Sequence, residues 1–217
     1  MKLLITSDMH LTAKAADKYR WGLFQWLVDQ ANHHRVDAVC ILGDLTDAKD
    51  RHSAELVNLV MDHLALLTEE IDGSVILLAG NHDFIDPQCP FFRMSQYLGG
   101  IYYVKEKRII TLETGEILAV PFHREGIENL TFSDNERACP VLLCHQTFSG
   151  AIASNGMKME GESQQVFEAF KGKIFSGDIH VPQQLQRVTY VGAPYRIRFN
   201  DTFEPRVLLY NDITPKK

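Results

Sequence analysis

Side chains that bind metals or carry protons follow one apolar, strand-like run after another in this chain. The run 75–79 ends at Gly80, and Asn81, His82 and Asp83 follow at once. The packing of a core does not require an amide, an imidazole and a carboxylate in succession. Such groups can coordinate a divalent cation or transfer a proton. We therefore take this stretch as part of a functional site.

Four other strand ends carry side chains of the same kinds, which are carboxylates and imidazoles without any thiolate. Such donors suit manganese, iron or zinc in a catalytic site better than a structural zinc. Seven metal ligands exceed the needs of one ion with an open position. They suit two ions that share a carboxylate, hold a phosphate and activate a water. The candidate ligands are Asp8, His10, Asp44, Asn81, His145, Asp178 and His180.

Each of these stretches has an ordinary explanation when it is taken alone. Asp8 and His10 would most often mark a turn, Asp44 after a glycine is a common strand exit, and His145 could be a satisfied polar residue. Short motifs carry false positives. The occurrence of all of them at successive strand ends favours one shared site.

The elements that must position these groups alternate in the first half of the chain. Strands are expected at 2–6, 37–42 and 75–79, with amphipathic helices at 17–33 and 53–68, the second capped by Ser53. This order predicts a parallel sheet with crossover helices. Open sheets of this kind bind ligands at the carboxyl ends of their strands.

The second half has shorter elements. We expect a short helix at 91–98, strands at 101–104, 108–112 and 116–120, a hairpin turn at Thr114 and Gly115, and buried strands at 141–144 and 173–176. Residues 146–162 are expected to form a mobile loop beside the site, followed by a short helix at 163–170. Two or three further strands are expected, at 185–191, 195–199 and 206–210. The simplest account is one domain over residues 1–217, with two sheets, flanking helices and no separate cap domain.

Composition narrows the class of protein. The 217 residues are 45% hydrophobic and 23% charged, and no apolar run approaches the length of a membrane span. The formal net charge of -6 argues against a broad basic surface for nucleic acid, but not against a phosphate held by cations. The four cysteines form no CxxC pair, which indicates reduced thiols and a cytoplasmic location.

The combination of Asp-x-His, Gly-Asp, Gly-Asn-His-Asp, a strand-end histidine and Gly-x-His resembles the calcineurin-like metallophosphoesterase superfamily. The resemblance implies an α/β fold with a two-sheet β-sandwich flanked by helices on both sides, in four layers. It implies that Asp44 bridges two ions and that His82 donates a proton to the leaving group or clamps the phosphate. Asp47 would hold the His82 imidazole, although a plain loop carboxylate is an equal alternative. The remaining ligands would divide into Asp8, His10 and His180 for the first ion and Asn81, His145 and Asp178 for the second.

One position departs from that family. The last motif is Gly177-Asp178-Ile179-His180, where the family usually has Gly-His-x-His. A carboxylate at Asp178 would favour harder cations such as manganese or magnesium. The alternative is a weakened second site that fills only together with substrate.

Three further stretches, 117–122, 177–183 and 190–196, resemble the SbcD-type DNA repair nuclease subunits. This resemblance implies two divalent ions, manganese most of all with magnesium, iron or zinc as alternatives, a DNA substrate and an SbcC-type ATPase partner. The chain would be a compact, phage-like form. Arg196 is the strongest candidate for a substrate contact, and His52 is a second one.

Three hypotheses for function stay open. The first is an exonuclease or endonuclease of the SbcD type acting on DNA. The second is a phosphodiesterase or phosphatase for a small nucleotide with the same metals. The third is a catalytically weak scaffold subunit in which Asp178 binds metal poorly. A homodimer is also open, and no association with a membrane is expected.

Overall fold

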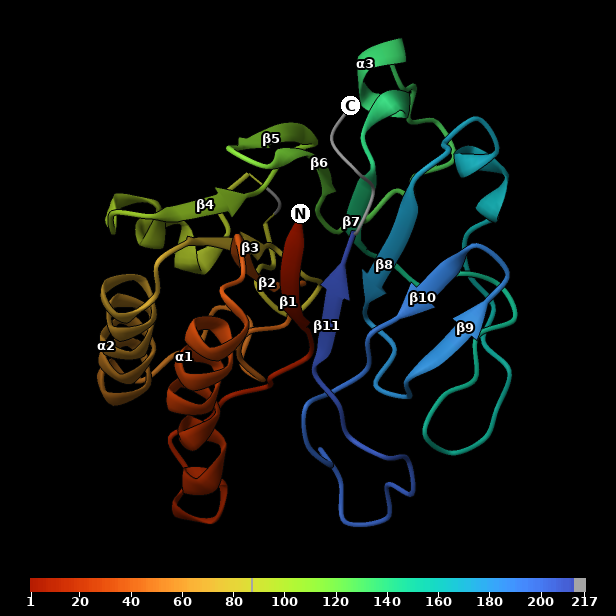
Figure 1. The fold of residues 1–217 in the computed structure, drawn as a ribbon. Coiled ribbons are helices and arrows are strands. Elements are labelled where there is room, and N and C mark those ends of the chain that lie inside the picture. Colours follow the sequence, from red (N-terminus) through yellow and green to blue (C-terminus); the bar gives the residue numbers. More distant parts are fainter. Residues whose placement is uncertain (87, 213–217) are drawn as a thin grey trace.

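Two β-sheets pack face to face in the computed structural model, which describes residues 1–86 and 88–212 (Figure 1). The first sheet has the strand order β11-β1-β2-β3-β4. Strands β1 to β4 are parallel, and β11 is antiparallel to β1. The carboxyl ends of β1, β2 and β3 therefore share one edge, as predicted. The strands are β1 Lys2–Thr6, β2 Ala38–Ile41, β3 Ser74–Leu78, β4 Ile101–Val104 and β11 Leu208–Asn211.

The second sheet has the order β5-β6-β7-β8-β10-β9. Its inner strands β6, β7, β8 and β10 are parallel, and antiparallel partners close both edges. The expected hairpin is confirmed as the β5–β6 pair. The strands are β5 Arg108–Leu112, β6 Gly115–Val120, β7 Val141–His145, β8 Lys173–Gly177, β9 Gln183–Leu185 and β10 Val188–Tyr190.

The core between the sheets explains why the strands are apolar throughout. Leu3 and Ile5 of β1 belong to the cluster shared with the second sheet, whereas Leu4 belongs to the cluster under the helices. Val141 and Leu143 of β7 face the first sheet in the same way. Parallel strands that are covered on both faces lose the polar alternation of a half-exposed strand. The predicted α/β two-sheet fold is therefore confirmed.

Two long helices, α1 Gly22–His34 and α2 Ala54–Glu70, cover the outer face of the first sheet (Figure 1). The predicted cap is confirmed, because the Ser53 hydroxyl accepts a hydrogen bond from Leu56 N at 3.2 Å. The helix expected from residue 17 begins as the 3-10 helix η1 Ala15–Trp21. The helix expected at 91–98 is also 3-10, as η2 Phe91–Tyr97.

The outer face of the second sheet has a thinner cover. It consists of η3 Gln164–Phe167, the short helix α3 Asp134–Ala138 and loops. The sequence analysis did not foresee α3, which a capping box between Ser133 and Glu136 stabilises. The loop 146–162, expected to be mobile, is instead anchored. Its Phe148 is fully buried, and a bridge joins Phe148 to Glu162.

Two expectations for the last part of the chain are wrong. The strand expected at 185–191 is divided into β9 and β10 by a turn with Gln186 at a φ of 50°. Residues 195–199 form no strand, because the backbone N–H groups of Ile197 and Arg198 bond to the side chain of Asp201 instead of a neighbouring strand.

Two further findings concern the thiols and the helices. All four cysteines are free, and only Cys89 is exposed. Among the described residues, no helix combines the length and the apolar character needed to cross a bilayer.

Candidate metal centre

Left-handed backbone marks three of the five strand ends that carry the candidate ligands. Asp8, His10, Asp44 and Asp178 have φ values of 53°, 42°, 53° and 77°. Such values are uncommon for residues other than glycine and concentrate at functional sites. Only two other non-glycine residues in the described chain, Arg35 and Gln186, have a positive φ. The sharp exit from these three strands is therefore a shared property of part of the site.

Asp44 lies between two groups of ligands. Its Oδ2 is 3.6 Å from Nε2 of His10, and its Oδ1 is 3.4 Å from Nε2 of His145. Oδ1 also accepts a hydrogen bond from His82 N at 2.8 Å. One carboxylate thus presents a different oxygen to each of two imidazoles, which is the arrangement that a bridging ligand requires.

The first group consists of Asp8, His10 and His180, whose ligand atoms all lie within 4.8 Å of one another. Nε2 of His10 and Nε2 of His180 are 3.1 Å apart. Burial lowers the pKa of His10, and it lowers the pKa of His180 to about 4. Both rings are therefore neutral at pH 7 and can offer lone pairs to a cation.

The second group has a fixed tautomer at its centre. Nδ1 of His145 donates to the carbonyl oxygen of Leu42, which can only accept, so the lone pair lies on Nε2. Asn81 Oδ1 lies 3.1 Å from this nitrogen, and Asp178 Oδ1 lies 3.7 Å from it. Together with Asp44 Oδ1, three side-chain oxygens therefore lie within 3.7 Å of this imidazole nitrogen, and such a set of electron-pair donors suits a cation.

The electrostatics of the buried carboxylates also fit bound cations. Burial raises the pKa of Asp8 to about 8. Burial raises the pKa of Asp44 well above its usual range, the Asp83 carboxylate adds to this, and Lys49 acts in the opposite direction. Carboxylates buried close together are unfavourable as anions without a countercharge. The residues present therefore fit a pair of divalent ions.

Asp178 is part of this site in spite of its departure from the family motif. Its backbone N–H donates to Asp8 Oδ1 at 3.2 Å, and its carboxylate accepts a hydrogen bond from the hydroxyl of Thr147. The side chain is thus held with one oxygen toward His145. Thr147 is a neighbour that the sequence analysis did not single out.

His82 and Asp47 lie next to His10. The His82 ring is 4.9 Å from the His10 ring, and its Nδ1 is 3.2 Å from the backbone oxygen of Asp47. The Asp47 carboxylate lies 3.6 Å from Nδ1 of His10. The hydrogen bond to His82 thus comes from the carbonyl oxygen of Asp47 and not from the carboxylate that was expected to hold it, while the ligand atoms of His10, Asp47 and His82 all lie within 4.8 Å of one another.

Asp83 organises the site, although the sequence analysis assigned no individual role to it. Its carboxylate accepts hydrogen bonds from the N–H groups of Gly80, Asp44 and Leu45 at 2.6, 2.9 and 3.1 Å. It therefore ties the loop after β2 to the loop after β3. A side chain at Gly80 would collide with the Asp44 carboxylate, so glycine is required at this approach. The position of Asp83 within Gly-Asn-His-Asp was the available signal.

The two expected substrate contacts lie outside the ligand groups. His52 bonds through Nε2 to the Thr46 hydroxyl at 2.7 Å, and its ring stacks on Phe91. Arg196 is exposed and does not line the hollow beside the site. Arg198, two positions later, lines that hollow together with Asp178 and His180.

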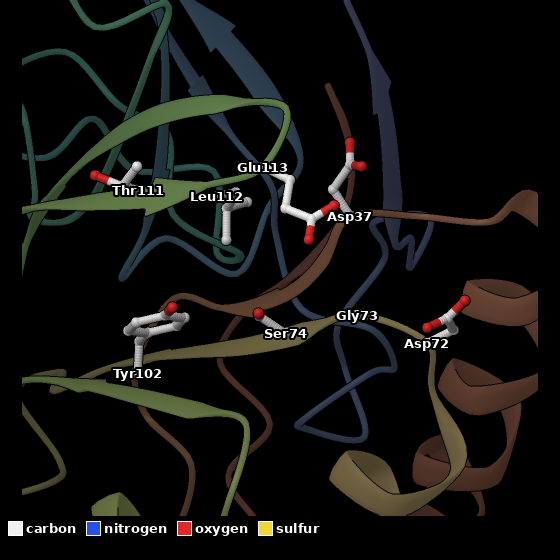
Figure 2. A pocket seen from close by; sticks show the side chains of 8 residues that line it. All are labelled: Asp37, Asp72, Gly73, Ser74, Tyr102, Thr111, Leu112 and Glu113. Atoms are coloured by element: carbon white, nitrogen blue, oxygen red, sulfur yellow. The ribbon is translucent and has the colours of Figure 1, made fainter.

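A second hollow, of about 380 Å³, lies at the opposite edge of the first sheet, where β2 and β3 begin (Figure 2). Asp37, Asp72 and Glu113 bring three carboxylates to its wall. Asp37 already accepts a hydrogen bond from Lys2 N at 2.6 Å. This hollow is separate from the candidate metal centre, which lies at the carboxyl ends of the strands.

The fold and the donor set are those of a metal-dependent phosphoesterase. A model of the family described as calcineurin-like phosphoesterase matches residues 1–182, so the chain belongs to that family. Membership of this family supports the conclusion that the protein is a metal-dependent hydrolase, and the geometry of the site supports the same conclusion.

Two curated relatives are components of nucleases. The chain is 28% identical to the SbcD component of the SbcCD nuclease of Escherichia coli (strain K12) over 89 residues, which is 39% of this chain and 22% of that protein. It is 20% identical to Exonuclease subunit 1 of Enterobacteria phage T4 over 219 aligned positions, which is 95% of this chain and 63% of that protein. The chain therefore spans less than two thirds of the length of either relative.

Proposed function

We propose that this protein hydrolyses phosphodiesters of DNA with two divalent metal ions, as an exonuclease or endonuclease of the SbcD type. The observation that carries the proposal is the position of Asp44, whose two oxygens face His10 and His145. Manganese is the proposed metal, because the carboxylate of Asp178, in place of a further imidazole, favours a harder cation. The relatives are named as a nuclease subunit and an exonuclease subunit, which supports a nucleic acid as the substrate and a further subunit as a partner. Within these classes we propose DNA and an SbcC-type ATPase.

The ligands divide between two ions in this proposal. Two adjacent divalent cations, when bound, polarise a phosphate and make a water nucleophilic. Asp44 belongs to both ligand sets and fixes the spacing between them. The first set adds Asp8, His10 and His180, and the second adds Asn81, His145 and Asp178.

His82 is the proposed proton donor to the leaving oxygen. Its Nδ1 faces the carbonyl oxygen of Asp47, which accepts a hydrogen bond from the ring in its neutral and in its charged form. Nε2 is thereby the nitrogen that gives up or takes up a proton. Because the side chain is partly exposed beside His10, it can reach a bound phosphodiester.

The small-nucleotide alternative has one observation in its favour. The net charge of -6 provides no broad basic surface for a long duplex. Cations at the site are local instead, and they include Lys14 near Asp47, Lys49 near Asp44 and Arg198 near His180. A small phosphodiester needs no more than these.

The test is an assay with manganese on duplex DNA ends, hairpins, single strands, small cyclic and linear nucleotides, and a chromogenic phosphodiester. Asp44→Asn is the control, because it removes the shared negative charge and should lose both metal and turnover. Hydrolysis of small nucleotides alone would favour the alternative. A chain that binds one ion or none and turns over nothing would be the scaffold subunit, and would overturn the proposal.

A further inference from the structure

The segment between β10 and β11 is a long loop that projects past the end of β1, at the edge where the metal centre lies (Figure 1). Its backbone is held from inside. The buried carboxylate of Asp201 accepts hydrogen bonds from Ile197 N at 3.0 Å and Arg198 N at 2.7 Å. A buried carboxylate that is bonded to backbone groups fixes the local chain path. The loop therefore presents Arg198 in a set position.

The same loop is attached to the first metal ligand group. Arg20, which is buried, donates to the carbonyl oxygen of His10 at 2.6 Å and to that of Ile197 at 3.4 Å. The Tyr195 hydroxyl donates to the carbonyl oxygen of Met9. Because one side chain holds both segments, the position of Arg198 is coupled to that of His10.

Arg198 has a charge with no partner in the described part of the chain. Its guanidinium makes no hydrogen bond or ion pair with the residues described, although its neighbour Asp201 is acidic. It lines a hollow of about 170 Å³ whose wall includes Asp178 and His180. An arginine that faces a phosphoesterase site without an acidic partner can pair with a phosphate through two parallel hydrogen bonds.

Phe199 follows Arg198 and is the most exposed large hydrophobic side chain described, with a relative exposure of 107%. Single exposed aromatic residues are common and need no explanation by themselves. This one lies on an anchored loop beside the site. A neighbouring hollow, of about 570 Å³, runs along the same loop and has apolar walls at Ile152, Val181 and Phe203. The two hollows share the lining residues Ala153, Ser154 and Asn155, so they are neighbours on the surface.

We propose that Arg198 and Phe199 recognise the nucleotide next to the hydrolysed phosphodiester, with Arg198 on its phosphate and Phe199 stacked on its base. The inference deepens the proposed function and rests on it. Stacking on an aromatic ring requires an unpaired base, so the ligand is a single-stranded nucleotide unit. Its source is either the unpaired end of a DNA chain or a free nucleotide, which share this chemistry.

The binding test uses the full chain without divalent metal, so that nothing is cleaved. The probes are oligothymidylate, an abasic oligodeoxyribose phosphate of the same length, and thymidine monophosphate. Phe199→Ala should weaken binding of oligothymidylate about tenfold and leave the abasic strand unchanged. Arg198→Ala should weaken both strands and reduce the salt dependence by about one phosphate contact. Tyr97→Ala and Arg108→Ala, which alter exposed residues elsewhere, should change neither.

A spectroscopic test separates stacking from a structural effect. In Phe199→Trp, oligothymidylate should quench the new fluorescence beyond the quench seen in the wild type, and the abasic strand should not. Quenching by the monophosphate as well would identify a free nucleotide as a ligand. Equal loss on abasic and base-bearing strands in Phe199→Ala, or no quenching in Phe199→Trp, would overturn the inference. If the protein hydrolyses no phosphodiester, the proposed function fails, and these binding results still decide the inference.

Discussion

Nε2 of His10 and Nε2 of His180 lie 3.1 Å apart, although 170 positions separate the two residues in sequence. Each ring is neutral at pH 7, because burial lowers both pKa values. Two neutral imidazoles that face each other can share at most one proton, whereas a cation accepts both lone pairs. Asp8 is the third member of this ligand group, and its carboxylate oxygen lies within 4.8 Å of a ring nitrogen of each histidine.

Replacement of His180 by alanine should remove one of the two metal ions. The first ligand group then keeps only Asp8, His10 and the shared Asp44. The number of manganese ions bound per chain, measured by metal analysis, should fall from about two to about one, and turnover should be lost. His33→Ala, which alters an exposed histidine at the end of α1, is the matched control and should retain both ions. An unchanged metal content in the His180 variant would contradict the assignment.

Replacement of His82 by alanine should reduce turnover by about 10²–10⁴ while the metal content stays intact. The effect should be much smaller on a nitrophenyl diester, because that leaving group departs without a proton. Steady-state kinetics on DNA and on the nitrophenyl diester measure the difference. A loss that is equal on both substrates would remove His82 from the role of proton donor.

Asp47→Asn should change turnover far less than His82→Ala. The group that faces His82 is the carbonyl oxygen of Asp47, which the substitution preserves. The carboxylate instead lies near His10, whose imidazole lowers the pKa of Asp47. A rate as low as that of His82→Ala would show that the carboxylate is needed for proton transfer.

The metal-free protein should lose stability as the pH rises from 6.5 to 8. Burial raises the pKa of Asp8 to about 8 from an ordinary value of 3.8, so the native state keeps a proton that the unfolded state has released. The loss is about 1.4 kcal/mol per pH unit for one such group. His10 and His180 have lowered pKa values, so they act with the opposite sign and only below about 6.5.

Urea unfolding at several pH values, with the metal removed by a chelator, checks this slope. Asp8→Asn should flatten it. Added manganese should raise stability more at pH 8 than at pH 6.5, because the ion competes with the proton for Asp8. A pH-independent stability of the metal-free protein would contradict the argument.

Asp83→Ala should destabilise the protein by about 3 kcal/mol, because three N–H groups lose a buried acceptor. Denaturant unfolding measures the change. Asp72→Ala, at an exposed position, should shift the midpoint by less than about 0.5 kcal/mol. Since Asp83 binds the backbone of Asp44, the variant should also bind manganese more weakly.

The sequence alone determined the α/β sandwich and the strand ends that carry the ligands. Runs such as 75–79 are apolar throughout because both faces of a parallel strand are covered, and a polar residue after such a run can only lie at the sheet edge. The family motifs then indicated which polar residues belong together, and the structure brings Asp8, Asp44 and His145 within one group.

Only the tertiary structure decided what each loop residue contacts. The hydrogen bond to His82 comes from the carbonyl oxygen of Asp47 and not from its carboxylate, Asp83 joins two loops, and Arg198 rather than Arg196 lines the hollow beside His180. The physical reason is that a strand end is fixed by local periodicity, whereas a loop side chain takes its direction from backbone hydrogen bonds to distant segments. Asp201 and Arg20 set the position of Arg198 in this way, and no local pattern encodes such contacts.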